Sequence, residues 1–323
     1  MRNFLYVSDT TDGHANLAFD EWLLDNVGDD DLILYLYVNA PSVIIGKNQN
    51  PWKECDLARM RADGVRLVRR ISGGGAVYHD EENLNFSFIA GKNRYDRERQ
   101  FRLIQNAVRN VGIECEFSGR NDLLADGKKF SGNAFCARGD KRQHHGTLLI
   151  NTKLDRLQNY LTPDPRKIRS KGIDSVRARV CNLAELAQGL DVDKMKTAVC
   201  TAFREDVGEY ELLTPNGQNR AEIAMYYEKH SSWEWCLGST PKFDIEFDTR
   251  FAWGGVQLQL SLEKSVIKKA VLYTDAINEG LSQKTAELLV GERFDRNTVC
   301  AKLSASNVPE LCDMALYLIE QDF

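Results

Sequence analysis

The feature that most constrains this chain is a run of three consecutive glycines at positions 73–75. The residues on either side, 65–70 and 76–79, favour strands, so the glycines must form a turn in which no residue carries a Cβ atom. Backbone N–H groups in such a turn can bind phosphate or carboxylate oxygens, and Arg69 or Arg70 can add a permanently charged guanidinium. A turn without any ligand would use the same glycines, so this motif alone does not settle the function.

The spacing of these glycines excludes two common nucleotide-binding motifs. The pattern GxGxxG is absent, and neither Gly-Lys-Ser nor Gly-Lys-Thr follows the turn. A nucleotide bound here would therefore need a different framework from a Rossmann or Walker loop.

The composition is that of an ordinary globular protein that is large enough for two domains. The chain has 323 residues, of which 43% are hydrophobic and 28% are charged. A formal net charge of −5 does not favour a nucleic-acid-binding protein, so local positive groups must hold any anionic ligand. The eight cysteines include no CxxC pair, and no stretch of the sequence is typical of a signal peptide or a bilayer span. We therefore expect a cytoplasmic location and no membrane association.

Patterns typical of strands and of helices alternate along the chain. Apolar residues recur at helical spacing in 13–27, whereas 83–89 alternates polar and apolar residues as a half-buried strand does. From residue 243 strands are followed by helices, which predicts a second unit of about 80 residues. We place the boundary near Thr240-Pro241 and expect domains at 1–240 and 241–323. Further strands are expected at 3–8, 32–38, 42–46, 114–117, 122–125, 129–136, 146–150, 243–247, 256–262 and 267–274, and further helices at 53–62, 98–111, 285–290 and 309–320.

A second candidate for chemistry is Lys129, which begins an alternating strand just after a segment with hairpin-turn composition, 125–128. A lysine on a strand face beside a glycine can point into a cleft and neutralise a phosphate, and Asp122 could orient it. The alternative is an exposed strand lysine, which is the commoner fate, and an aspartate that only caps a turn.

Two further segments carry groups that could bind a ligand. His144 and His145 are adjacent, so on a strand at most one of them faces a given pocket, and no metal-ligand spacing surrounds them. Segment 162–180 contains two prolines and a dense basic run, which indicates a long loop. It could close over a charged intermediate, or it could be a solvated basic loop.

Taken in order, these phrases resemble the bacterial lipoate–protein ligase A family. The resemblance is strongest over 65–183 and extends over nearly the whole chain. It implies an α+β fold of mixed sheets with flanking helices, in which a catalytic domain like that of class II aminoacyl-tRNA synthetases and biotin–protein ligases precedes a small α/β C-terminal domain. The matching phrases are RRISGGGAVYHD, GRNDLL, GKKFSG, HHGTLLIN and KGIDSVRARVCNL, and NPWKEC, SSWEW and FAWGGV also fit.

The resemblance also implies a role for individual residues. Lys129 would be catalytic and would contact both the lipoate carboxylate and the α-phosphate; strand alternation favours it over Lys128 as the inward-facing amine. Nucleotide or adenylate contacts are implied for Arg70, Gly75, Ala76, Val77, Tyr78 and Asp122. Positions near the acyl group are implied for Ser72, Gly73, Gly74, His79 and His145, and a loop that closes over lipoyl-AMP would contain Lys171, Gly172, Ser175 and Arg179.

The activity implied by the resemblance is an ATP-dependent ligation. With Mg²⁺, whose protein ligands the sequence does not identify, ATP and lipoate would give lipoyl-AMP and pyrophosphate. The lipoyl group would then pass to a lysine of a lipoyl-domain acceptor, such as an E2 subunit of a 2-oxoacid dehydrogenase or the glycine-cleavage H protein. A cation between two repelling anions lowers the barrier, and no enzyme nucleophile is required. We expect a monomer with no nucleic-acid partner.

Three alternatives remain open at this point. The chain could be a cysteine-dependent octanoyl or lipoyl transferase of the same superfamily, with Cys136 or Cys181 as the nucleophile, although both cysteines could equally be small buried residues. Its substrate could be biotin or another small acid. It could also be a non-catalytic module that binds an adenylate or an acceptor protein.

Overall fold

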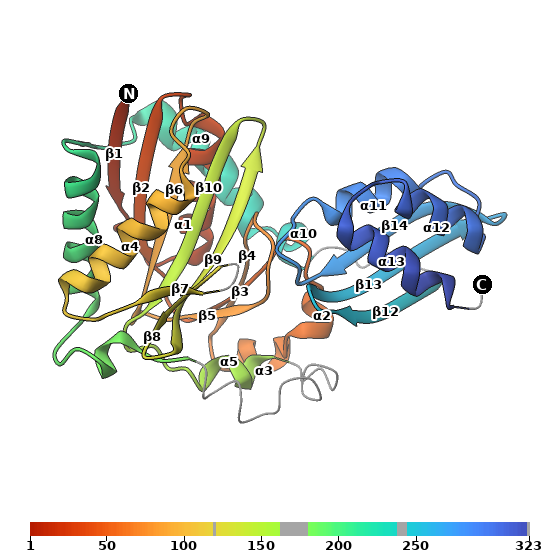
Figure 1. Cartoon of the computed structure of the whole chain (residues 1–323), viewed down its shortest axis with the longest axis horizontal. Coiled ribbons are helices and arrows are strands. Elements are labelled where there is room, and N and C mark those ends of the chain that lie inside the picture. The colour runs from red at the N-terminus through yellow and green to blue at the C-terminus, as the bar shows by residue number, and fades with distance from the viewer. Residues whose placement is uncertain (119–120, 162–179, 238–243, 322–323) are drawn as a thin grey trace.

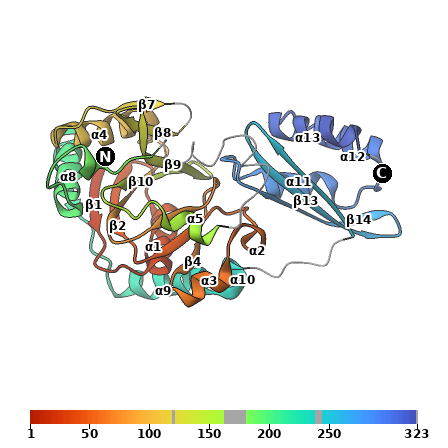
Figure 2. The ribbon, with the colours of Figure 1, turned by 90° about the horizontal axis from the view of Figure 1, so that it is seen from below.

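A computed structural model of the chain describes residues 1–118, 121–161, 180–237 and 244–321 and leaves out the side chains of residues 52, 53 and 157. The described residues form two packed units side by side, a larger one that contains the N-terminus and a smaller one towards the C-terminus (Figures 1 and 2). The expected boundary near Thr240-Pro241 lies outside the described residues. The division into domains at 1–240 and 241–323 therefore stays a prediction.

The larger unit is built on an eight-stranded mixed sheet with the order β11-β1-β2-β6-β10-β9-β8-β7. Strand β1 runs parallel to β11 and β2, and the remaining neighbours are antiparallel. The strands are β1 (Arg2–Val7), β2 (Asp31–Val38), β6 (Asn83–Ala90), β7 (Glu116–Ser118), β8 (Asp122–Ala125), β9 (Lys128–Arg138), β10 (Lys141–Leu149) and β11 (Glu211–Leu212).

Helices lie on both sides of this sheet. On one face α4 (Arg97–Asn110) packs against α8 (Val192–Val207), and on the other α1 (Gly13–Asn26) packs against α9 (Gly217–Ser231) (Figure 1). As a result, every residue of β6 is buried. The expectation that this strand is half-buried is wrong, because its polar positions face the interior beneath α1 rather than solvent.

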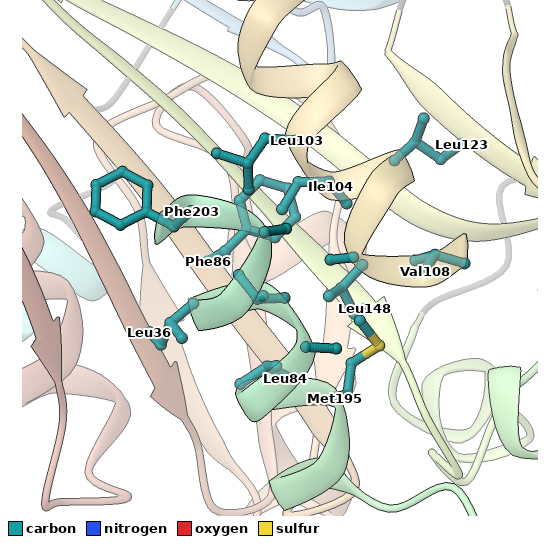
Figure 3. Packing of buried hydrophobic residues seen from close by; sticks show 14 of the residues in the cluster. Leu36, Leu84, Phe86, Leu103, Ile104, Val108, Leu123, Leu148, Met195 and Phe203 are labelled. Carbon is teal, nitrogen blue, oxygen red and sulfur yellow. The ribbon is translucent and has the colours of Figure 1, made fainter. Parts of the chain in front are cut away.

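Alternation along β2 sends its side chains into two separate cores. Leu34 and Leu36 belong to the core beneath α4 and α8, which also contains Phe86 and Phe203 (Figure 3). Tyr35 belongs to the second core, beneath α1. A strand that is apolar on both faces is typical of a sheet covered by helices on both sides.

A small three-stranded sheet, in the order β4-β3-β5, lies beside the large one and contains the glycine turn. Strand β3 (Ser42–Ile45) pairs in parallel with β4 (Arg66–Arg69) and antiparallel with β5 (Val77–His79). Residues 73–75 lie in the connection from β4 to β5. The turn is therefore held at the edge of a sheet whose other elements fix both of its ends.

The helix expected at 53–62 is interrupted. It forms α2 (Pro51–Glu54) and α3 (Leu57–Ala62), because Cys55 makes an isolated bridge to Leu161 and Asp56 caps α3 by accepting the N–H of Arg59. The remaining short elements of the larger unit are α5 (Arg156–Tyr160), a 3₁₀ turn (Leu183–Glu185) and α10 (Trp233–Cys236).

The smaller unit is a three-stranded antiparallel sheet, in the order β12-β13-β14, with helices on one face (Figure 1). It has a core of its own, formed within residues 256–318. The sequence patterns missed α12 because its apolar residues show weak helical spacing. The elements are β12 (Ile245–Phe251), β13 (Gly254–Glu263), β14 (Val266–Thr274), α11 (Leu281–Leu289), α12 (Arg296–Ser304) and α13 (Pro309–Ile319).

The predicted α+β architecture of mixed sheets with flanking helices is confirmed. Among the helices of the described residues, none has the length and apolar character needed to cross a membrane.

Candidate active site

A cavity of about 210 Å³ lies where the glycine turn and small sheet face the large sheet. Its lining brings together residues that are far apart in the sequence, from helix α1 to strand β10. Of the residues expected at a binding site, those on its lining are Arg70, Gly74, Gly75, Ala76, Val77, His79, Lys129 and His145.

Lys129 reaches this cavity through a hairpin and a bulge. Asp126 and Gly127 have positive φ angles of 49° and 68°, as a tight hairpin turn requires. The pairing of β8 with β9 then shifts register next to Lys129, and such a bulge changes the direction of nearby side chains. Lys128 is exposed, whereas Lys129 lines the cavity, so strand alternation predicted the inward-facing amine.

The ammonium group of Lys129 makes an ion pair with Asp122. The Nζ and Oδ1 atoms are 2.7 Å apart, and each side chain is 35% exposed. Asp122 itself is not on the cavity lining. In this structure it therefore holds the lysine amine beside the cavity instead of facing the cavity itself.

Gly132 provides the space that this amine occupies. A Cβ atom at position 132 would lie 3.0 Å from Nζ and 3.1 Å from Cε of Lys129. Side chains this close must move apart by a few tenths of an ångström, and a catalytic group is sensitive to such a shift. The sequence reasoning did not select Gly132.

We expect Gly132→Ala to lower the kcat/KM of the acid-activation step by about fivefold, because it displaces the Lys129 amine without removing it. Steady-state kinetics compared with thermal unfolding would check this. A loss of activity that merely parallels a loss of Tm would contradict the positioning role. Gly217→Ala, at the exposed first residue of α9 where a Cβ meets nothing within 4 Å, serves as the control for a change at a glycine.

The end of the basic segment is attached to the backbone of the same lysine. Val180 bridges in parallel to Lys129, and the N–H of Cys181 donates to the Lys129 carbonyl at 3.0 Å. The predicted loop residues Lys171, Gly172, Ser175 and Arg179 lie outside the described residues.

Arg70 organises the glycine turn from within. Its guanidinium donates to the carbonyls of Ile44, Gly73 and Gly75 and to the hydroxyl of Ser72, at 2.8 to 3.1 Å. Burial lowers the pKa of Arg70 to about 10, so it stays charged at neutral pH. Contact with a nucleotide was expected for Arg70. The structure shows in addition that most of its N–H groups hold the glycine turn.

Arg69 faces away from the cavity. It donates to the carbonyls of Lys47, Gln49, Trp235 and others on α10 and on the segment after β3. Of the two arginines offered by the sequence, only Arg70 is part of the cavity wall.

Ser72 and His145 belong to a buried chain of hydrogen bonds. The Ser72 hydroxyl is 2.6 Å from Nε2 of His145, and Nδ1 of His145 is 3.2 Å from the carboxylate of Asp20 on α1. Ser72 is fully buried behind the turn, so it supports His145 instead of lining the cavity. His144 faces the opposite side of β10, as alternation predicted, and is bonded to Gln100 and Asn133.

Three of the residues expected to contact a ligand also have groups directed away from the cavity, although Gly74 is on its lining. Gly73 faces the smaller unit, where a Cβ would lie only 2.6 Å from the carbonyl oxygen of Ile277. The N–H of Gly74 donates to the Ala276 carbonyl at 2.8 Å. The side chain of Tyr78 lines a second cavity on the other face of β5 and stacks on Tyr160, so only its backbone is on the side of the glycine turn.

The floor of the cavity contains residues that the sequence reasoning missed. Tyr37, Asn85 and Thr147 lie opposite one another on β2, β6 and β10. Polar residues at alternate positions of β6 were the available signal. Because the sequence does not show that α1 covers this face of the sheet, they could only indicate a face turned towards solvent. Asp20 could have been noticed as a carboxylate within the apolar residues of α1.

Comparisons with known proteins agree with this arrangement. The sequence profile of the lipoyl protein ligase A/B catalytic domain matches residues 12–204, and that of the bacterial lipoate protein ligase C-terminus matches residues 240–315. A lipoate-protein ligase A from Psychrobacter cryohalolentis is 39% identical over 309 residues, which is 93% of this chain and 91% of that protein. The chain belongs to the lipoate–protein ligase A family.

Solved structures of lipoate ligases share its fold. P. falciparum LipL1 in complex with lipoate covers 99% of this chain at 28% identity, with a TM-score of 0.87. A lipoate-protein ligase A bound with ATP covers 74% of the chain at 29% identity, with a TM-score of 0.63. The bipartite lipoate protein ligase of Thermoplasma acidophilum, from a study of that ligase and its E2 lipoyl domain, covers 76% at 29% identity, with a TM-score of 0.67. The resemblance drawn from the sequence phrases is therefore confirmed.

Proposed function

We propose that this member of the lipoate–protein ligase A family activates lipoate with ATP and transfers it to a lysine of a lipoyl-domain protein. The observation that carries the proposal is the position of the Lys129 amine, which shares one cavity with the glycine turn held by Arg70. Family members with ATP or lipoate bound support the choice of both substrates.

In the first step a carboxylate oxygen of lipoate attacks the α-phosphorus of ATP. The bond from that phosphorus to the bridging oxygen breaks, and pyrophosphate leaves with the electron pair. Two anions approach one another, so a fixed ammonium group between them lowers the barrier. Lys129 would be released from Asp122 to take this position.

The carboxylate of Asp122 could take part in holding a magnesium ion that arrives with ATP, once Lys129 has left it. Asp122 offers the carboxylate oxygen that Mg²⁺ prefers, and phosphate oxygens and water would complete the coordination, as is usual for this ion. Within the described ranges no group of three or more His, Cys, Asp or Glu residues could hold a metal. When bound, Mg²⁺ would neutralise charge on the departing pyrophosphate.

In the second step the acceptor lysine, in its neutral form, attacks the acyl carbon. The bond to the AMP oxygen breaks, the amine loses a proton, and the products are the lipoyl amide and AMP. No acyl-enzyme is formed. Lipoyl domains are the proposed acceptors, with E2 subunits of 2-oxoacid dehydrogenases and the glycine-cleavage H protein as the specific candidates. Monomeric state and cytoplasmic location stay predictions.

Pyrophosphate exchange with a panel of acids tests the activation step. Exchange should depend on lipoate and be absent with biotin. Exchange with biotin but not with lipoate would overturn the substrate assignment, and no exchange with any acid would overturn the activation step itself.

Replacing Cys136 and Cys181 together is expected to leave lipoate-dependent exchange and transfer within about twofold of the wild type. Both thiols are buried, and burial raises the pKa of each, which disfavours the thiolate that a nucleophile needs. Serine and alanine variants should be compared, because a buried serine can be destabilising. Loss of transfer in a folded alanine variant would instead favour a thioester mechanism.

A further inference from the structure

The imidazole of His79 is fixed in one tautomer by a chain of amides. The side-chain NH₂ group of Asn16 has three oxygen acceptors around it, which fixes the orientation of that amide: Oδ1 of Asn39 at 2.8 Å and the carbonyls of Thr10 and Val38 at 3.1 Å, so that one of its two N–H groups is shared between two acceptors. The NH₂ group of Asn39 is then 2.9 Å from Nδ1 of His79. Because that nitrogen must accept, the proton of the neutral ring is on Nε2.

This N–H group has no partner among the described residues. His79 is 3% exposed and lines the cavity, and its Nε2 atom is buried without a hydrogen bond. Burial, with the nearby charge of Arg70, lowers the pKa of His79 to about 3, so the ring stays neutral. A buried donor without an acceptor is costly, which indicates that something in the cavity accepts from it.

The donor lies at the end of the cavity away from Lys129. Lys129 is on β9, whereas Tyr37 is on β2, with β10 and β6 between them, and three strand spacings give about 14 Å. Asn39 follows β2 directly, so the bond from Asn39 places His79 at the β2 end. Leu17 and Ile44 also line the cavity, so apolar side chains lie near this N–H group, together with Tyr37 and Asn85 of the cavity floor.

We propose that the Nε2–H of His79 donates to a ring sulfur of lipoate, and that Asn39 is the residue that positions this donor. The inference rests on the proposed function, since a carboxylate held at Lys129 directs the distal ring of the acid towards the β2 end. It makes His79 and Asn39 the residues that distinguish lipoate from octanoate, an acid of similar chain length without the ring.

The preference follows from what each acid does to the N–H group. In the free protein, water in the cavity can accept from it. Octanoate displaces that water and offers no acceptor, so the donor is left unpaired. A ring sulfur is a weak acceptor but restores part of the bond. The expected preference for lipoate is about five- to tenfold in kcat/KM.

The substitution Asn39→Asp tests the positioning role directly. A carboxylate at this place can only accept, so it reverses the tautomer and turns the lone pair of Nε2 towards the cavity. The tautomer is read from ¹⁵N chemical shifts of the His79 ring, and the preference from pyrophosphate exchange with lipoate and octanoate. Asn182→Asp places a carboxylate at another buried asparagine and is the matched control.

The wild-type ring should be protonated on Nε2, and Asn39→Asp should move the proton to Nδ1 and reduce the lipoate-to-octanoate ratio by about fivefold. Asn182→Asp should leave the ratio unchanged. If Asn39→Asp does not fold, His79→Phe should lower the same ratio. A wild-type ring protonated on Nδ1, or a ratio that is unaffected in either folded variant, would overturn the inference while leaving the proposed function intact. Absence of exchange with both acids would overturn the proposed function and this inference together.

Discussion

Lys129→Ala is expected to lower the kcat/KM for formation of lipoyl-AMP by about a hundredfold, which corresponds to the loss of about 3 kcal/mol of transition-state stabilisation. Lys129 and Arg70 both line the cavity beside the glycine turn. The N–H groups of Arg70 are bonded to carbonyls of the turn, whereas the Lys129 amine does not hold the turn and can face a ligand. Without it, the lipoate carboxylate and the α-phosphate lose the positive charge that this amine would place between them.

The neighbouring lysine provides a matched control. Lys128→Ala removes the same charge from the exposed face of the same strand, and adenylate formation should stay within about twofold of the wild type. Single-turnover formation of lipoyl-AMP separates this effect from acyl transfer. If both variants lose activity equally, the overall charge of the hairpin is responsible and not the position of one amine.

Glu21→Gln is expected to lower the free energy of unfolding at pH 7 by about 3 kcal/mol. The carboxylate is on α1 with its side chain 2% exposed, and Lys229 and His230 donate to it at 2.6 Å, with Arg138 as a third partner. Burial alone would raise the pKa of Glu21. Hydrogen bonds from His230, Lys229 and Arg138 outweigh that effect and lower the pKa to about 2. A neutral amide at this position would leave Arg138, Lys229 and His230 without the negative charge that they surround, which destabilises the folded state.

The sign of the pH dependence follows from the lowered pKa. A carboxyl that binds its proton less readily in the folded state stabilises that state above the pKa of the unfolded chain, 4.5, and the benefit is lost as the pH falls towards about 2. The difference in unfolding free energy between the wild type and Glu21→Gln should therefore narrow below pH 4.5. Urea denaturation at several pH values measures this, and Glu228→Gln, on the exposed side of α9, is the control. A difference that is constant with pH would contradict the assignment.

Much of the fold could be predicted because local patterns agree with the final structure. The helix expected at 13–27 and the hairpin at 125–128 appear with almost the expected limits, since apolar spacing and turn composition act over a few residues. The burial of β6 could not be predicted in this way. It depends on α1 covering a face of the sheet that polar residues occupy, and no short window contains that information.

In the candidate site, too, the residues whose orientation follows from a local pattern could be predicted, whereas those that depend on distant contacts could not. Strand alternation correctly favoured Lys129 as the inward-facing amine, and it predicted that at most one of His144 and His145 would line the cavity, which is His145. Asp20 was missed because its partner is 125 positions away in the sequence, and the role of Asn39 depends on a contact with His79 across two sheets. Family phrases predict which residues lie at the site, but they do not reveal that Tyr78 faces the other side of its strand.

The hydrogen bond from Gly74 to Ala276 links occupancy of the turn to the neighbouring unit. One backbone N–H donates well to one oxygen at a time, so an anion that recruits the Gly74 amide must compete with the Ala276 carbonyl. Competition of this kind is thermodynamically reciprocal: whatever loosens residues 275–280 raises the anion affinity of the turn, and a bound anion weakens the hold on those residues by the same factor.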